Sequence, residues 1–111
     1  MTTTLEIELD AAMMDLYRRA RAEVNYTATR YLQMLNERRG LETAQLLLHT
    51  ASVSEGYEAL WERGRLDLTV EALILQPRWN ELFTDEDREL ARSRLRDYGF
   101  DLSSLEVESD G

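Results

Sequence analysis

The ten residues 66–75, LDLTVEALIL, are apolar on nearly every side and constrain the fold of this chain more than any other segment. A helix that is apolar all round is stable when neighbouring elements pack against every side of it. The run holds too few β-branched residues to favour a strand. The sequence therefore predicts a central helix over 66–75, with the rest of the protein packed around it.

Upstream of this run, apolar residues recur at steps of three and four, the spacing of one helical face. The pattern predicts a first helix over about 12–24, a second over 27–40 and a short third over 41–49. The second helix is expected to stop at Gly40, because glycine adopts the left-handed conformation of a helix end without steric penalty. We expect the first two helices to form an antiparallel hairpin.

Capping residues mark the later helices. Ser52 stands three residues before Glu55, the capping-box spacing, and predicts a fourth helix over 53–63 that ends at Gly64. Its expected core face consists of Tyr57, Leu60 and Trp61.

Two further helices are predicted near the end of the chain. Pro77 suits the first turn of a short helix that carries Trp79. Thr84 precedes three acidic residues, which favour the positive end of a helix dipole, and this start signal predicts a last helix that runs to Tyr98 and stops at Gly99.

These segments together predict an all-α fold, a compact single-domain bundle of about six or seven short helices over residues 1–102. A chain of this length is one domain by size and buries roughly two thirds of the surface that its unfolded form exposes. Residues 103–111 are too polar and acidic to add to a core, so we expect them to form a flexible, disordered acidic tail.

The composition excludes several kinds of site. There is no cysteine, so neither a disulfide framework nor a thiolate metal site is available. There is no lysine and a single histidine, while arginine, which cannot act as a base at accessible pH, is abundant. The acidic first residues and the lack of a long apolar run argue against a signal peptide or a membrane span, so we expect a cytoplasmic protein.

Two candidates for catalysis have simpler explanations. His49 is the one side chain with an unperturbed pKa near neutral, but it falls at the end of a helix, where we expect it to serve as a cap. The densest acidic group is explained by the dipole of the last helix; it consists of Asp85, Glu86, Asp87 and Glu89. We therefore assign no catalytic, cofactor-binding or metal-binding residue and expect no enzyme activity.

Five segments carry a family resemblance. From about residue 16 to 98 the chain resembles a family of short uncharacterised bacterial helical proteins, which also occurs as a terminal segment of larger bacterial proteins. The matching segments are LYRRA at 16–20, YTATRYLQMLNERRGLETAQLLL at 26–48, SEGYEALWERGRLDLTVEALIL at 54–75, LFTDED at 82–87 and ARSRLRDYG at 91–99. The resemblance implies one intact all-α domain and supplies no catalytic residue, ligand or reaction.

The segment WERGRLD at 61–67 is the strongest candidate for binding a partner. Trp61 stands beside Arg63 and Arg65, and amphipathic aromatic and arginine side chains are enriched where proteins meet. The alternative is a helix end and tight turn in which the arginines pair with Glu62 and Asp67. Trp79 also has two interpretations, as a core residue or as an exposed residue that contacts a partner. The leading hypothesis is a non-catalytic protein–protein interaction module or accessory subunit.

Nucleic acid is the second candidate partner. The whole chain has a net charge of −9, but residues 13–41 hold six arginines and three acidic residues. The hypothesis places phosphates on arginines of this basic hairpin, with tyrosines available for stacking; the candidates are Arg18, Arg21, Tyr26, Arg30, Arg38 and Tyr31. The alternative is an ordinary solvated helix face with ion pairs one turn apart.

Overall fold

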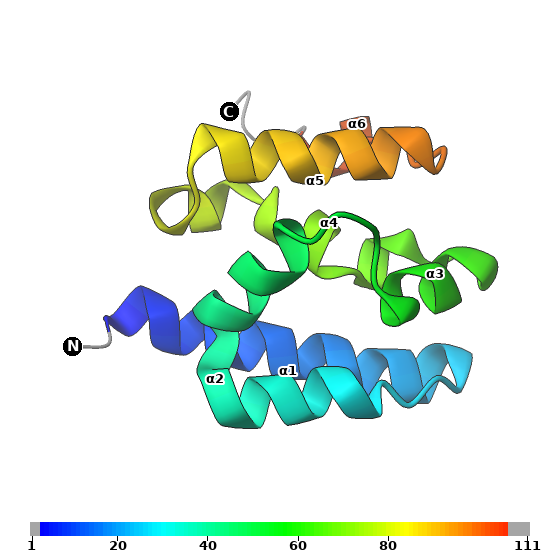
Figure 1. Cartoon of the computed structure of the whole chain (residues 1–111), viewed down its shortest axis with the longest axis horizontal. Coiled ribbons are helices and arrows are strands. Elements are labelled where there is room, and N and C mark those ends of the chain that lie inside the picture. Colours follow the sequence, from blue (N-terminus) through cyan, green and yellow to red (C-terminus); the bar gives the residue numbers. More distant parts are fainter. Residues whose placement is uncertain (1–2, 107–111) are drawn as a thin grey trace.

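The computed structural model, which describes residues 3–106, is a compact bundle of helices measuring 32 × 32 × 27 Å (Figure 1). Between residues 3 and 106 the chain forms no strand, so the predicted all-α fold is confirmed. With η for a 3-10 helix, the elements are α1 Thr4–Val24, α2 Thr29–Leu48, α3 Glu55–Glu62, η1 Leu66–Leu68, α4 Val70–Ile74, η2 Pro77–Leu82, α5 Asp85–Asp97 and α6 Ser103–Glu106.

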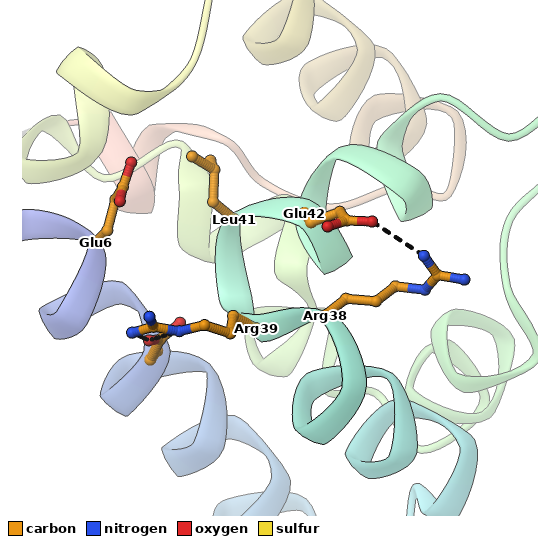
Figure 2. A pocket seen from close by; sticks show the side chains of 6 residues that line it. Glu6, Arg38, Arg39, Leu41 and Glu42 are labelled. Atoms are coloured by element: carbon orange, nitrogen blue, oxygen red, sulfur yellow. Dashed lines mark hydrogen bonds and ion pairs between the residues drawn. The ribbon is translucent and has the colours of Figure 1, made fainter. Parts of the chain in front are cut away.

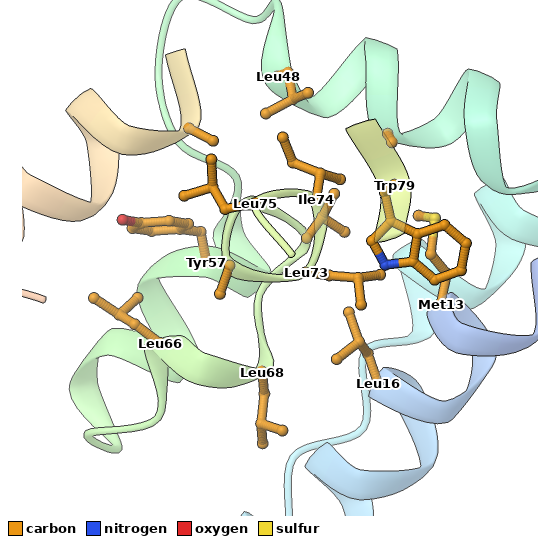
Figure 3. Packing of buried hydrophobic residues seen from close by; sticks show 14 of the residues in the cluster. Met13, Leu16, Leu48, Tyr57, Leu66, Leu68, Leu73, Ile74, Leu75 and Trp79 are labelled. Atoms are coloured by element: carbon orange, nitrogen blue, oxygen red, sulfur yellow. The ribbon is translucent and has the colours of Figure 1, made fainter. Parts of the chain in front are cut away.

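The apolar run 66–75 lies at the centre of the molecule, as predicted. All of its residues except Asp67 are buried, and Figure 3 shows Ile74 and Leu75 surrounded by side chains from other helices. The α1–α2 hairpin lies on one side of this centre and α5 on the other (Figure 1). None of the helices in the described part of the chain has both the length and the apolar composition needed to cross a membrane.

The prediction of one continuous helix over 66–75 was wrong. Thr69 has an extended backbone, and its hydroxyl accepts a hydrogen bond from the Ala72 amide at 3.2 Å, which starts α4. The same hydroxyl donates to the Leu66 carbonyl at 2.7 Å, which closes η1. A buried threonine therefore divides the run, because its side chain satisfies backbone groups at both helix ends.

Helices α1 and α2 form the predicted antiparallel hairpin. The Tyr31 hydroxyl of α2 donates to the Met13 carbonyl of α1 at 2.8 Å. Helix α1 begins at Thr4, well before the predicted start near residue 12, because Thr3 and Glu6 form a capping box. The early start buries Leu9 completely, a core residue that the prediction left out.

The predicted break at Gly40 exists, but its predicted cause was wrong. Helix α2 spans both predicted segments, and its kink lies at Arg39, where φ is 69° and ψ is 177°. Gly40 permits instead a close approach of α1, since an added Cβ would lie 2.9 Å from the Asp10 carboxylate and 3.3 Å from the Asp10 Cα. The Gly40 amide donates to this carboxylate at 2.7 Å, and Arg39 forms an ion pair with it.

Helix α3 ends as predicted and begins differently. Its cap is Ser54, whose hydroxyl accepts from the Tyr57 amide at 3.1 Å, so the capping box predicted at Ser52 was wrong. The helix ends before Gly64, which has a positive φ of 72°. Trp61 was predicted to lie on the core face and is 47% exposed.

Helix α5 follows its predicted start and stop. Thr84 and Asp87 form a capping box, and Gly99 has the left-handed backbone of a helix end, with φ of 82°. Helix α6 occupies the first residues of the predicted tail, and its Leu105 packs against the core. The rest of the predicted tail, 107–111, lies outside the described residues.

Candidate functional site

A cavity of about 930 Å³ lies between the α1–α2 hairpin and the layer formed by α3, the loop before it and the start of α4. This volume is in the range of small-molecule binding sites, roughly 300–1,000 Å³. Much of its wall is aromatic or apolar; the lining includes Tyr17, Tyr26, Tyr31, Met34, Tyr57 and Leu60. The cavity therefore has the size and wall composition of a ligand site.

Glu71 brings a carboxylate to this cavity from the buried helix α4. The residue is 4% exposed, and its Oε2 accepts a hydrogen bond from Arg94 of α5 at 3.1 Å. Burial raises the pKa of Glu71 above its usual range, and its own backbone amide and the nearby Arg94 only partly offset this shift. A buried, partly compensated carboxylate in a cavity is a common mark of a functional site.

Two tyrosines of the cavity wall lie within electrostatic reach of Glu71. Burial raises the pKa of Tyr57 and of Tyr31, and in both cases the charge of Glu71 raises it further. The Tyr31 hydroxyl already donates to a backbone carbonyl of α1. The Tyr57 hydroxyl is buried and has no hydrogen-bond partner among the described residues.

Arg94 divides its hydrogen bonds between Glu71 and the loop after α2. Nη1 donates to the Leu47 carbonyl at 2.7 Å, and Nη2 donates to the Thr50 carbonyl. Arg94 donates one hydrogen bond to Glu71, and its other hydrogen bonds hold α5 against the loop. The arrangement fixes the position of the loop that forms one edge of the cavity.

A second buried carboxylate, Asp87, joins the end of α2 to the start of α5. Its Oδ1 lies 2.7 Å from His49 Nε2, and its Oδ2 accepts from Gln45 at 2.9 Å and from the Thr84 amide at 3.0 Å. Burial alone would raise the pKa of Asp87, but the bonds from Gln45, Thr84 and His49 outweigh it and lower the pKa. His49 is the C-cap residue of α2, as predicted, and its ring contacts the Asp87 carboxylate of α5.

The acidic side chains at the start of α5 point to different partners and do not form one cluster. Asp85 forms an ion pair with Arg88, and Glu89 pairs with Arg92 and Arg96, while Asp87 points inward. Among residues 3–106, no group of three or more His, Asp or Glu side chains is arranged to hold a metal ion.

The four predicted partner-binding residues do not share one surface. Trp79 is fully buried in η2, so the prediction that it contacts a partner was wrong and the alternative of a core position is confirmed (Figure 3). Trp61 is exposed, and its ring packs edge-on against Tyr98 at 5.2 Å.

Both arginines of WERGR have internal contacts. Arg63 donates to the Val24 and Ala59 carbonyls and lies over the Tyr26 ring at 5.0 Å. Arg65 pairs with Glu23 at 2.6 Å and with Asp67 at 2.9 Å. The pair with Asp67 is the one that the turn interpretation predicted, whereas Arg63 bonds to carbonyls instead of Glu62. Both side chains tie the turn after α3 to the end of α1.

Some of the predicted nucleic-acid residues have partners within the chain, and others do not. Arg38 pairs with Glu42 at 3.0 Å, whereas Arg18, Arg21 and Arg30 are exposed and form no ion pair within the described chain. Arg30 lines the cavity, and the two arginines of α1 do not. Arg63 lies over the Tyr26 ring, and the Tyr31 hydroxyl is bonded to α1, so both tyrosines have contacts within the chain.

A smaller hollow of about 260 Å³ lies beside the kink of α2. Figure 2 shows its two arginines turned away from each other, with Arg38 toward Glu42 and Arg39 toward α1. Each of these charges is engaged with a carboxylate at the hollow's own wall. The hollow therefore offers less to a ligand than the larger cavity.

Glu71 is the site residue that sequence reasoning missed. The signal was present, because Glu71 is the one acidic residue in the otherwise apolar stretch 68–75. An acid in a segment predicted to be buried on all sides needs a partner or a function. What the sequence did not indicate was Arg94 as that partner, 23 residues further along the chain.

Comparison with known proteins adds no assignment. No family model, curated protein or solved structure matches the chain. The function is therefore argued from the geometry of the chain itself.

Proposed function

We propose that this protein is a non-catalytic binding module, or accessory subunit, that binds another protein through the exposed face of α3 around Trp61. The observation that carries the proposal is the Trp61 side chain, 47% exposed and held edge-on against Tyr98. Tyr98 is itself fixed by a similar contact with Tyr57, at 5.0 Å. The indole is thus held in place before any partner arrives.

A pre-positioned tryptophan suits a protein interface for physical reasons. Tryptophan is enriched among the few residues that dominate binding energy, because its large ring buries much apolar area. A ring already fixed by its neighbours loses little conformational entropy on binding.

The surroundings of Trp61 suggest the chemistry of the partner. Glu58 and Glu62 are exposed on the same helix and form no ion pair within residues 3–106. With a net charge of −9 on the whole chain, this face favours a partner that carries basic residues around an apolar pocket. Association should therefore slow as salt is added.

The test is a purification of the tagged chain from its native host, with co-purifying proteins quantified by mass spectrometry. Trp61→Ala should remove a stoichiometric companion. Leu46→Ala, which truncates another exposed apolar side chain (41% exposed), is the matched control and should retain it. Retention of the companion by the Trp61 variant, or a lone monomer from the wild type, would refute the proposal.

The nucleic-acid alternative rests on Arg18, Arg21 and Arg30, which have no acidic partner in the described chain. Contact of these arginines with phosphates would weaken steeply with salt. Half of each purified sample is treated with nuclease. Recovery of nucleic acid, with companions lost on digestion, would favour the alternative over the Trp61 face.

A further inference from the structure

We propose that the exposed ring of Trp61 binds an arginine side chain of the partner protein, whose guanidinium stacks on the indole and donates to the carboxylates of Glu58 and Asp97. This inference rests on the proposed function and names the residue through which a basic partner engages the face of α3. The arginine contact can be absent while the interface exists, so the two proposals are tested separately.

One face of the Trp61 ring is open to solvent. Its contact with Tyr98 is edge-to-face, with an interplanar angle of 84°, and such a pair covers at most one face of either ring. The residue as a whole is 47% exposed. Within residues 3–106 an arginine lies over the rings of Tyr26 and Trp79, and none lies over Trp61. The open face can therefore take a cation from outside the chain, and tryptophan attracts cations more strongly than the other aromatic side chains.

Two carboxylates stand beside this ring on different helices. Glu58 lies three positions before Trp61 on α3, and side chains at this spacing are neighbours on a helix surface. Asp97 lies on α5 and directly precedes Tyr98, the ring that contacts Trp61. Both acids are exposed, and neither forms an ion pair in the part of the chain that the structure describes. Their oxygens can therefore accept hydrogen bonds from a partner.

Two helix ends add negative charge to the same surface. Trp61 lies in the last turn of α3, and Tyr98 is the C-cap of α5. The C-terminal end of a helix carries a partial negative charge and favours a cation. The arginines near these ends are engaged with other groups: Arg63 and Arg65 bond to the end of α1, and the two in the last turn of α5 pair with other carboxylates.

The chemistry of the guanidinium favours arginine over lysine at this position. A guanidinium is planar and weakly hydrated, so it stacks on an aromatic face while its N–H groups point outward in the plane. These donors reach carboxylates beside the ring without leaving it. A lysine ammonium is a compact, strongly hydrated charge and loses more hydration on the same surface. An acidic partner segment would meet the like charges of Glu58 and Asp97.

The experiment compares three peptides with different central residues. The full chain is titrated with Gly-Leu-Arg-Leu-Gly and with the same peptide carrying lysine or citrulline, the uncharged isostere of arginine, at its centre. Amide and indole chemical shifts are followed by NMR, and Trp61→Phe assigns the Trp61 indole signal. The arginine peptide should bind about threefold or more tighter than the lysine peptide and about tenfold or more tighter than the citrulline peptide. Equal affinity for arginine and either of the others, or an unshifted Trp61 indole, would overturn the proposal.

Two double variants test the carboxylates. Glu58→Gln/Asp97→Asn should weaken binding of the arginine peptide about fivefold and leave the citrulline peptide unchanged. Glu81→Gln/Glu86→Gln removes the same charge from exposed positions in η2 and at the opposite end of α5, and should change affinity less than about twofold. Because all four side chains are exposed, both variants should fold. Equal losses in the two variants would show that only net charge matters and would refute the assigned contacts.

Purification from the native host separates this inference from the proposed function. A fall in companion recovery in both Trp61→Ala and Glu58→Gln/Asp97→Asn would support both proposals. Loss of the companion in Trp61→Ala, with recovery unchanged in the double variant, would overturn the arginine contact and leave the proposed function standing. Unchanged recovery in both variants would refute both proposals.

Discussion

Glu71 and Asp87 are both buried carboxylates, 4% and 3% exposed, yet their pKa values move in opposite directions. Glu71 receives hydrogen bonds from its own backbone amide and from Arg94, but burial prevails, so its pKa is raised. Asp87 receives bonds from three donors, and together they prevail over burial. The comparison shows that the charge of a poorly exposed carboxylate stabilises the fold only where the hydrogen bonds to it outweigh the cost of its burial.

The two carboxylates should affect stability in opposite ways as pH changes. The folded pKa of Asp87 lies below its usual value of 3.8, so its contribution to stability is present above that value and is lost as pH falls through the folded pKa. The folded pKa of Glu71 lies above its usual value of 4.5, so ionised Glu71 lowers stability at higher pH, and this penalty disappears as pH falls toward 4.5.

The largest expected effect comes from removing the one charged partner of Glu71. Arg94→Met should lower the free energy of unfolding at pH 7 by about 3–5 kcal/mol, because it leaves the buried Glu71 without its charged partner and removes the guanidinium bonds to the Leu47 and Thr50 carbonyls. The loss should shrink as pH falls and Glu71 takes up a proton. Urea unfolding across pH measures it. Arg96→Met removes an exposed pair with Glu89 and is the control, expected to cost no more than about 1 kcal/mol.

Removing the charge of Asp87 should have the next largest effect. Asp87→Asn should cost about 2–3 kcal/mol at pH 7, since the amide carries no charge and has one acceptor oxygen where the carboxylate has two. The variant should also lose the part of the acid destabilisation that occurs below pH 3.8. Asp85→Asn, at a side chain 98% exposed, should change stability by less than about 0.5 kcal/mol. Equal losses in the two variants would contradict the conclusion that the hydrogen bonds to Asp87 make its charge stabilising.

His49 tests the contribution of one donor. His49→Ala leaves Asp87 with the bonds from Gln45 and Thr84 and should cost about 1–2 kcal/mol at pH 7. The pKa of Asp87, followed by carboxyl carbon NMR, should rise in the variant, because one of the bonds that lower it is gone. An unchanged pKa of Asp87 would show that His49 contributes nothing to the balance.

The smallest effect is expected at Glu71, where burial dominates the shift in pKa. Glu71→Gln should change stability at pH 7 by no more than about 1 kcal/mol, because removing a poorly compensated buried charge offsets the loss of its bond to Arg94. The stability gain that the wild type shows as pH falls toward 4.5 should be absent. A loss of stability as large as that of Asp87→Asn would mean that the charges of both carboxylates stabilise the fold, which would contradict the difference inferred between them.

Local signals predicted the later helices well. Thr84 with Asp87 started α5, and Gly64 and Gly99 ended helices with the left-handed backbone expected of glycine. These features depend on residues within one turn of each other, so they can be inferred without the rest of the fold. Thr3 with Glu6 was a signal of the same kind that the prediction overlooked.

Predictions failed where a distant residue decided the outcome. Gly40 is a glycine because α1 passes close to it, and Trp79 is buried because the core closes over η2. The cavity was not foreseen, since its walls come from separate helices and the loop before α3.

The sequence by itself determined an all-α chain with an apolar run at its centre, because helical period, caps and glycine stops are local properties. Only the tertiary structure decided which charges are buried and what faces them. Glu71 meets Arg94 across 23 positions, and Asp87 meets His49 across 38. The reason is physical: a buried charge depends on the donors that packing brings to it, and packing joins residues that the sequence keeps far apart.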